Sequence, residues 1–200
     1  MYSSAWSKEV VELCQKFRDD GVVAMDIAGD TEGVVDTSAE DVEAFQLAYR
    51  LGVHRTVHAG EDGPADQVRF ALEQLFAERI GHGYHVVEDD ALYHRCLDMD
   101  VHFEACPNSS LLTGAVKDRT VKHPIVRYAE DGANFSINRD DTALIQKTLD
   151  DDYELLRSLG LNDLHFARAN FNAARSAFLP DDEKQTLIDK LMNVYGVPTL

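Results

Sequence analysis

Short apolar runs recur along this chain, and each has the length of a buried strand. They are VVAMDI from Val22, HRTVH from His54, RIGHG from Arg79, VHFEAC from Val101 and NFSIN from Asn134. The three gaps between the first four runs contain residues 39–51, 64–77 and 89–98. In each of these segments the apolar side chains are three and four positions apart, which is the helical period. Strands that begin every 22 to 33 residues with helices between them predict strand–helix units and a parallel sheet.

Residues that can supply polar contacts, through side chains or backbone, gather where each apolar run ends. They are Asp26, Gly29 and Asp30; His58 and Glu61; His82 and His85; Cys106 to Ser110; and Asn138 to Asp141. A barrel of eight strand–helix units builds its active site from the carboxyl ends of its strands, so this pattern favours an α/β fold of the TIM-barrel type. A doubly wound sheet would concentrate its ligand contacts at one switch point, and the chain contains no G-x-G-x-x-G or phosphate loop.

The chain is short for such a barrel, which needs about 250 residues when complete. Its 200 residues supply five strand–helix units and then only helical patterns, over residues 147–159, 163–176 and 181–195. We therefore expect a single domain over residues 1–200 that is a partial TIM-type barrel without its amino-terminal units. Its open strand edges would favour self-association.

Composition and charge limit the classes of partner that the chain can bind. The chain is 44% apolar and 28% charged, which is typical of a soluble globular protein. Its net charge of −17, with no run among 19 basic residues, argues against nucleic-acid binding and anionic membranes and suits a small neutral or cationic ligand. No stretch predicts a signal peptide or membrane insertion. Three sparse cysteines indicate reduced thiols and a cytoplasmic location, with a cell-surface or lysosomal pool left open.

The segment His58-Ala59-Gly60-Glu61 and the doublet Asp140-Asp141 contain the chemistry of half a zinc site. Imidazole and carboxylate are ordinary zinc ligands, and a nearby Glu that is not a ligand suits a proton shuttle. A lone H-x-x-E is usually an ordinary turn, but its place after a strand, with Gly as a hinge, favours function. The two acids repel each other unless a cation or donor lies between them. Asp is equally a good helix N-cap, and both uses are compatible.

His82 lies between Gly81 and Gly83, so little side-chain bulk separates its imidazole from a neighbouring site. Taken alone, a satisfied core histidine is about as plausible as a functional one. The histidines at positions 54, 94, 123 and 165 lack such settings and are interpreted as structural or surface residues. Cys106 is interpreted as core packing.

Taken together, these segments resemble the adenosine deaminase family, the zinc-dependent purine-nucleoside deaminases of barrel fold. The likeness covers nearly the whole chain, in family order, through WSKEVVELC, VVAMDIAGD, HRTVHAGE, ERIGHGYHVVED, VHFEACPNSSLLTG and NFSINRDD. HAGE followed by GHGYH and a strand-ending DD is specific as a set, and much more so than any single motif.

The resemblance implies a role for each candidate residue. His58 and Asp140 would ligate Zn²⁺, Glu61 would exchange a proton with the purine N1, and His82 would orient or deprotonate the zinc-bound water. Asp141 would contact N7, and the backbone N–H of Gly29 would contact N3. The implied reaction is hydrolytic deamination of adenosine or 2'-deoxyadenosine to the inosine product and ammonia.

The chain also departs from the family pattern. The H-x-H strand that supplies two further zinc ligands has no counterpart here, because no His-x-His occurs in the sequence. Asn108 stands where an aromatic residue is usual, and Arg139 and Thr142 flank the acidic doublet where Thr and Pro are usual. Two alternatives therefore stand beside the deaminase: a non-catalytic remnant that binds a partner or purine weakly, and a relative that acts on AMP or a modified adenosine.

Overall fold

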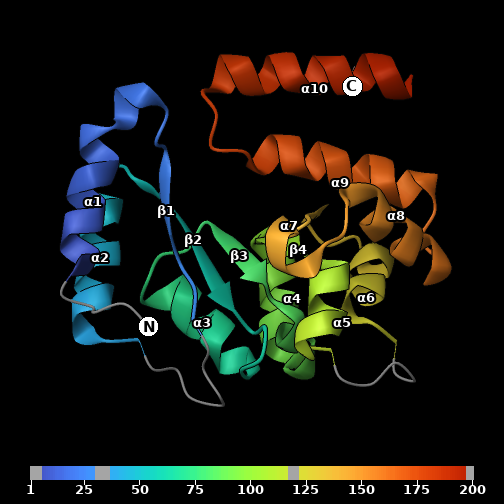
Figure 1. Cartoon of the computed structure of the whole chain (residues 1–200), viewed down its shortest axis with the longest axis horizontal. Helices are drawn as coiled ribbons and strands as arrows, with labels where there is room; N and C mark the ends of the chain where they lie inside the picture. Colours follow the sequence, from blue (N-terminus) through green and yellow to red (C-terminus); the bar gives the residue numbers. More distant parts are fainter. Residues whose placement is uncertain (1–5, 30–36, 117–121, 197–200) are drawn as a thin grey trace. The chain divides into compact units, whose positions relative to one another are not determined.

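The computed structural model describes residues 6–29, 37–116 and 122–196. The chain divides between Val101 and His102 into two compact units, and both alternate strands with helices (Figure 1). The first unit contains β1 (Ala24–Ile27), β2 (His54–Ala59) and β3 (Arg79–His82), and the second contains β4 (His102–Ala105) and β5 (Phe135–Ile137). Four of the five strands fall within the apolar runs that predicted them, and β2 extends one residue beyond its run, to Ala59.

In the first unit, β2 lies between β1 and β3 and runs parallel to both. Its register places Thr56 beside Asp26, and His58 beside Gly81. Because all three strands point the same way, their carboxyl ends meet at one edge of the sheet. The polar residues that follow these strands are therefore brought to the same edge.

The first unit surrounds these strands with α1 (Ser7–Lys16), η2 (Arg18–Asp20), α2 (Ala39–Arg50), α3 (Ala65–Glu73), η3 (Tyr84–Glu88) and α4 (Asp90–Asp98). The Ser38 side chain accepts a hydrogen bond from Asp41 N, and Asp89 accepts one from Leu92 N, so both α2 and α4 begin at a side-chain N-cap. The three helices expected here are confirmed, although α3 ends four residues before position 77.

The second unit contains α5 (Pro107–Thr113), α6 (Pro124–Asp131), α7 (Thr142–Ile145), α8 (Leu149–Ser158), α9 (Asp163–Ser176) and α10 (Asp181–Tyr195). β4 and β5 are parallel, with Phe103 beside Phe135, and the Phe103 ring stacks on Tyr128 of α6 at 4.9 Å. α9 packs on β5, and α10 packs on α9. The helices α8, α9 and α10 confirm the expected carboxyl-terminal helices, whereas α5 and α6 were not expected.

No helix in the described part of the chain is both long enough and apolar enough to span a membrane. Cys14, Cys96 and Cys106 are buried, and none of the three is in a disulfide. Burial raises the pKa of the Cys96 thiol to about 11, so this thiol is an unreactive part of the core at neutral pH.

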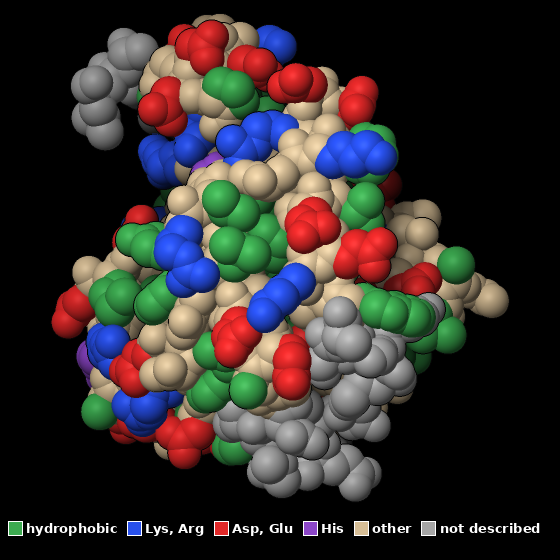
Figure 2. Space-filling view, turned by 90° about the vertical axis from the view of Figure 1, so that its left-hand side faces the viewer, with side chains coloured by type: hydrophobic (Ala, Val, Ile, Leu, Met, Phe, Trp, Pro, Cys, Tyr) green, Lys and Arg blue, Asp and Glu red, His purple; other side chains and the backbone are tan. Residues whose placement is uncertain are grey.

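The outer face of α1 exposes a stripe of large apolar side chains. Trp6, Val10, Leu13 and Phe17 are 54%, 40%, 42% and 39% exposed, and their spacing places them on one side of the helix. Figure 2 views the side of the molecule that carries α1 and α2, where hydrophobic side chains lie among acidic and basic ones. Beside this stripe, β1 pairs with no described strand other than β2. An apolar stripe next to an open strand edge is a surface that another chain can cover.

We therefore expect the 200-residue chain to self-associate, with the α1 stripe in the contact. Burying one Val or Leu side chain contributes about 1.5–3 kcal/mol, so Val10→Glu combined with Leu13→Glu should shift the population toward monomer. Size-exclusion chromatography with light scattering measures this shift. The control is Val194→Glu on α10, because Val194 is 78% exposed and lies outside the stripe. A sharp monomer peak for the unmodified chain would contradict the expectation.

Candidate active site

The end of β2 and the turn after it present His58 and Glu61. Gly60 makes this turn with φ of +63°, a conformation that glycine adopts without steric cost. A side chain here would also collide with α3, because a Cβ built on Gly60 would lie 2.9 Å from the Val68 side chain. The glycine predicted as a hinge is therefore required both by the backbone conformation and by the packing of α3.

Asp26 of β1 orients the His58 ring. Its Oδ1 atom lies 3.1 Å from His58 Nδ1, and a carboxylate oxygen accepts, so Nδ1–H is the donor. In this tautomer Nε2 of His58 carries the lone pair, and a histidine whose other ring nitrogen donates to a carboxylate is typical of metal ligands. The sequence placed Asp26 at a strand end but did not assign it this role, because the contact depends on the pairing of β1 with β2.

Gly81 makes room for the His58 ring on the other side. The two residues are neighbours across β2 and β3, and a Cβ on Gly81 would lie 3.0 Å from ring atoms of His58. Any larger residue would push the imidazole away. The glycines around His82 were expected to open space near that residue, but Gly81 serves the histidine on the adjacent strand.

His82 ends β3 and is only 2% exposed. Its ring centroid lies 5.0 Å from that of His58, and its Nε2 atom lies 3.4 Å from Oε2 of Glu61. At this separation the two groups form an ion pair when the imidazole is protonated, and a small movement would bring them within the reach of roughly 2.6–3.2 Å that proton transfer needs. The φ of His82 is +64°, an uncommon conformation for a residue with a side chain, and such outliers cluster at functional sites.

A small pocket opens beside these side chains within the first unit. Its lining residues are Gly29, His58, Ala59, Glu61, Asp62 and Gln67. Three of them were predicted as site residues, and the structure brings these three together. Asp30, which the sequence also placed at this edge, lies outside the described residues.

Gln67 of α3 was not identified from the sequence. Its Oε1 atom accepts a hydrogen bond from Gly60 N at 3.1 Å and so fixes the turn that carries Glu61. The amide also fills the space beside Gly63, where a Cβ would lie only 2.1 Å from Gln67 Nε2. The sequence alone does not mark a glutamine at the start of a helix as functional, since only the fold brings its amide to the backbone of Gly60.

In the second unit, the acidic doublet lies just beyond β5. Asp140 has φ of +66°, and its Oδ2 atom accepts a hydrogen bond from Ser109 Oγ at 2.6 Å. Asp141 accepts hydrogen bonds at 2.9 Å from the backbone N–H groups of Ala143 and Leu144, which confirms it as the N-cap of α7. Its contact with purine N7 stays a prediction.

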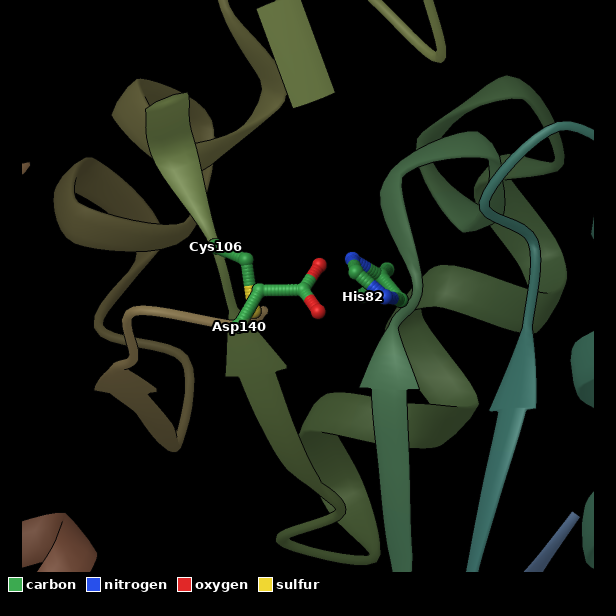
Figure 3. Close-up of side chains that lie close together, drawn as sticks. All are labelled: His82, Cys106 and Asp140. Carbon is green, nitrogen blue, oxygen red and sulfur yellow. The ribbon is translucent and has the colours of Figure 1, made fainter. Parts of the chain in front are cut away.

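Figure 3 shows the Cys106 and Asp140 side chains next to each other, and it shows His82 at the end of β3. The Cys106 Sγ atom and a carboxylate oxygen of Asp140 lie within 4.8 Å of each other. Cys106 is buried, as expected for a packing residue, so the Asp140 carboxylate is flanked by a serine hydroxyl and a thiol.

A buried histidine supports the helix that carries Ser109. His123 caps α6 by accepting from Ile125 N through Nδ1, so its Nε2–H donates to Ser110 Oγ at 2.9 Å. Ser110 Oγ in turn donates to Pro107 O at 2.7 Å. Burial lowers the pKa of His123 to about 4, because the charged form of the ring is costly away from water. His123 is therefore a neutral structural residue, as the sequence suggested.

Comparison with known proteins identifies the family of this chain. The family model described as "Adenosine deaminase" matches residues 1–194. An adenosine deaminase of Danio rerio is 50% identical over 193 residues, which are 96% of this chain and 54% of that protein. The chain therefore belongs to the adenosine deaminase family. It spans about half the length of the curated relatives it matches.

Solved structures of the same fold include an adenine deaminase from Arthrobacter aurescens. It matches with a TM-score of 0.85 and 28% sequence identity, and the match covers 98% of this chain and 59% of the adenine deaminase chain. An amidohydrolase from Burkholderia ambifaria, solved with bound Zn, has a TM-score of 0.80 and 22% identity, with 98% and 57% of the two chains covered. The prediction of a partial TIM-type α/β barrel is confirmed by these neighbours.

The buried neutral state of His123 predicts a loss of stability in mild acid. The unfolded chain takes up a proton near pH 6.5, whereas the folded chain resists it until about pH 4, so the free energy of unfolding falls as pH drops through this window. Between pH 7.5 and 5 the loss from this residue is about 2 kcal/mol. Urea unfolding at both pH values, compared with His123→Asn, isolates the effect, since Asn can cap α6 without titrating. Equal pH dependence in the two proteins would contradict a neutral His123.

Proposed function

We propose that this chain carries part of the catalytic machinery of an adenosine deaminase, which hydrolyses adenosine or 2'-deoxyadenosine to the inosine product and ammonia. The observation that carries the proposal is the group formed by His58, Glu61 and His82. One imidazole is oriented as a ligand by Asp26, and the other lies 3.4 Å from a carboxyl at the edge of the pocket. A side chain suited to bind a metal therefore lies beside side chains suited to transfer a proton, which is the combination that hydrolytic deamination requires.

We propose zinc as the metal, with His58 and Asp140 as two of its ligands. The donor chemistry fits, because His58 Nδ1 is already paired with Asp26 and a neutral imidazole with a paired second nitrogen is a good zinc ligand. Asp140 offers a carboxylate whose Oδ2 is oriented by Ser109. When bound, zinc supplies Lewis-acid activation of water near neutral pH.

The remaining residues would move protons and hold the purine. His82 takes a proton from the attacking water, whose oxygen forms a bond to C6. Glu61, in its protonated form, gives a proton to N1 as the ring loses aromaticity. The amino group then gains the proton held by His82 and leaves as ammonia as the C6–N6 bond breaks, while the C6 hydroxyl returns a proton to Glu61 and becomes the C6=O group of the product. We assign contacts with N3 and N7 to the backbone N–H of Gly29 and to Asp141.

The charge of the chain favours a nucleoside over a nucleotide. A net charge of −17 repels a dianionic phosphate, whereas adenosine is neutral. AMP deamination is therefore the weaker candidate, and it is tested by assaying adenosine, 2'-deoxyadenosine and AMP side by side. A cytoplasmic location stays a prediction from the sparse cysteines.

A non-catalytic role is the second candidate. It rests on the ligand count within these 200 residues, because the family pattern identifies two zinc ligands among them, His58 and Asp140. The loss of ultraviolet absorbance as adenosine becomes inosine, measured together with ammonia release, separates an enzyme from a protein that only binds purine or a partner.

We expect the 200-residue chain to retain zinc poorly. A catalytic zinc normally takes three or more protein ligands, and the proposal identifies two. The measurement is metal analysis after dialysis against a mild chelator. Stoichiometric zinc that survives dialysis would show that this chain supplies further ligands.

In any form of the protein that deaminates adenosine, Glu61→Gln should lower kcat by about 10²- to 10⁴-fold and leave the zinc content unchanged, because an amide cannot deliver the proton. His58→Ala should instead lose zinc and activity together. Steady-state kinetics and metal analysis of the same preparations distinguish these outcomes.

The matched control for the carboxyl variant is Glu88→Gln. Glu88 is 62% exposed and contacts His85 rather than the pocket, so this variant should keep full activity. If Glu61→Gln retained half of the unmodified activity, Glu61 would not be the proton donor.

A further inference from the structure

Asp152 is a fully buried carboxylate in the first turn of α8, at 0% exposure. Its Oδ1 atom accepts two hydrogen bonds from Asn108, from the backbone N and from Nδ2, both at 2.9 Å. Its Oδ2 atom accepts from Nη1 of Arg139. Asp152 therefore joins three segments of the second unit: the start of α5, the turn after β5 and the start of α8.

A second link joins the start of α5 to the turn after β5, one residue further along each segment. Ser109 Oγ donates to Oδ2 of Asp140 at 2.6 Å. Residues 108 and 109 are thus tied to residues 139 and 140 by two adjacent bridges, one through Asp152 and one direct. Two neighbouring bridges fix both the position and the rotation of the turn, which a single bridge does not.

The turn needs such support because Asp140 has φ of +66°. A left-handed conformation costs a residue with a side chain roughly 1 kcal/mol or more, so it persists only where the surroundings hold it. Asp140 itself is exposed, and the rigid surroundings on its amino-terminal side are supplied by Arg139, whose side chain is 9% exposed.

The ion pair is a poor stabiliser, which argues for a different role. Nε and Nη2 of Arg139 are buried and have no hydrogen-bond partner among the described residues. Buried ion pairs with unsatisfied donors often cost more in desolvation than they return, and apolar or neutral replacements can be equally stable. A costly pair placed directly beside a strained site residue is better explained by positioning.

We propose that Asn108, Asp152 and Arg139 form a positioning clamp that holds Asp140 in its left-handed conformation. Two positions at which this chain departs from the family pattern, Asn108 and Arg139, thus meet on one carboxylate. The role of Asp140 as a metal ligand rests on the proposed function. The clamp itself depends only on the geometry of the second unit.

Cys106 reports on the clamp without any metal or turnover. Its buried thiol lies within 4.8 Å of an Asp140 carboxylate oxygen and two residues before Asn108. Local opening of the clamp should therefore expose it to a thiol reagent. Cys14 and Cys96 are buried in the first unit and serve as internal controls in the same sample.

The experiment compares Arg139→Met, Asp152→Asn and the double variant with the unmodified chain. Each single change leaves a buried group without its partner and should lower the thermal midpoint by roughly 5 to 10 °C. The double variant removes both charges while Asn keeps an oxygen for the Asn108 donors, so it should recover most of that loss. N-ethylmaleimide labelling, measured for each cysteine by peptide mass spectrometry, is the decisive readout.

In the double variant, Cys106 should be labelled at least about tenfold faster than in the unmodified chain, while Cys14 and Cys96 stay within about twofold. Arg157→Met is the matched control, because Arg157 is 55% exposed and pairs with an exposed Asp163 in the same unit. It should change no labelling rate. The clamp is refuted if Cys106 keeps its original rate in the double variant, or if all three thiols accelerate together, which would mark a general loss of stability. Absence of deaminase activity from every form of the protein that contains these residues would refute the proposed function, and it would leave these labelling outcomes decisive for the clamp.

Discussion

The parallel pairing of β2 with both of its neighbours is the constraint on which the first unit depends. This register places His58 between Asp26 on one strand and Gly81 on the other, so the imidazole is held by a hydrogen bond on one side and by an absent side chain on the other. A shift of one residue along β3 would turn every side chain of that strand to the opposite face. The orientation of the imidazole is therefore a property of the sheet rather than of the loop.

The second unit reaches a comparable precision by a different route. Its acidic doublet lies beyond the last regular pair of β5, where no ladder of hydrogen bonds can hold it. Side chains from α5 and α8 replace the ladder there, and the bonds to Ser109 and Asp152 do the work that backbone pairing does in the first unit. Rigid placement of site residues thus comes from neighbouring strands in one case and from buried polar contacts in the other.

Much of the fold could be predicted from the sequence because strands in parallel sheets are continuous apolar runs and their ends are marked by polar residues. The glycine at position 60 and the acidic doublet were recognisable for the same reason. The orienting roles of Asp26, Gln67 and Asp152 were not, because each acts on a residue outside its own helix or strand and becomes visible only through register or helix packing. The short helices α5 and α6 were not predicted from the spacing of apolar residues, although each begins with a proline at a favoured position.

The backbone conformation of Asp140 has a consequence for how this position can evolve. Glycine adopts φ near +66° without steric cost, so Asp140→Gly would relax the turn by roughly 1 kcal/mol. Selection for folding stability alone would favour that change and lose the carboxylate. An aspartate at this position therefore trades folding stability for a negatively charged oxygen at one point in space.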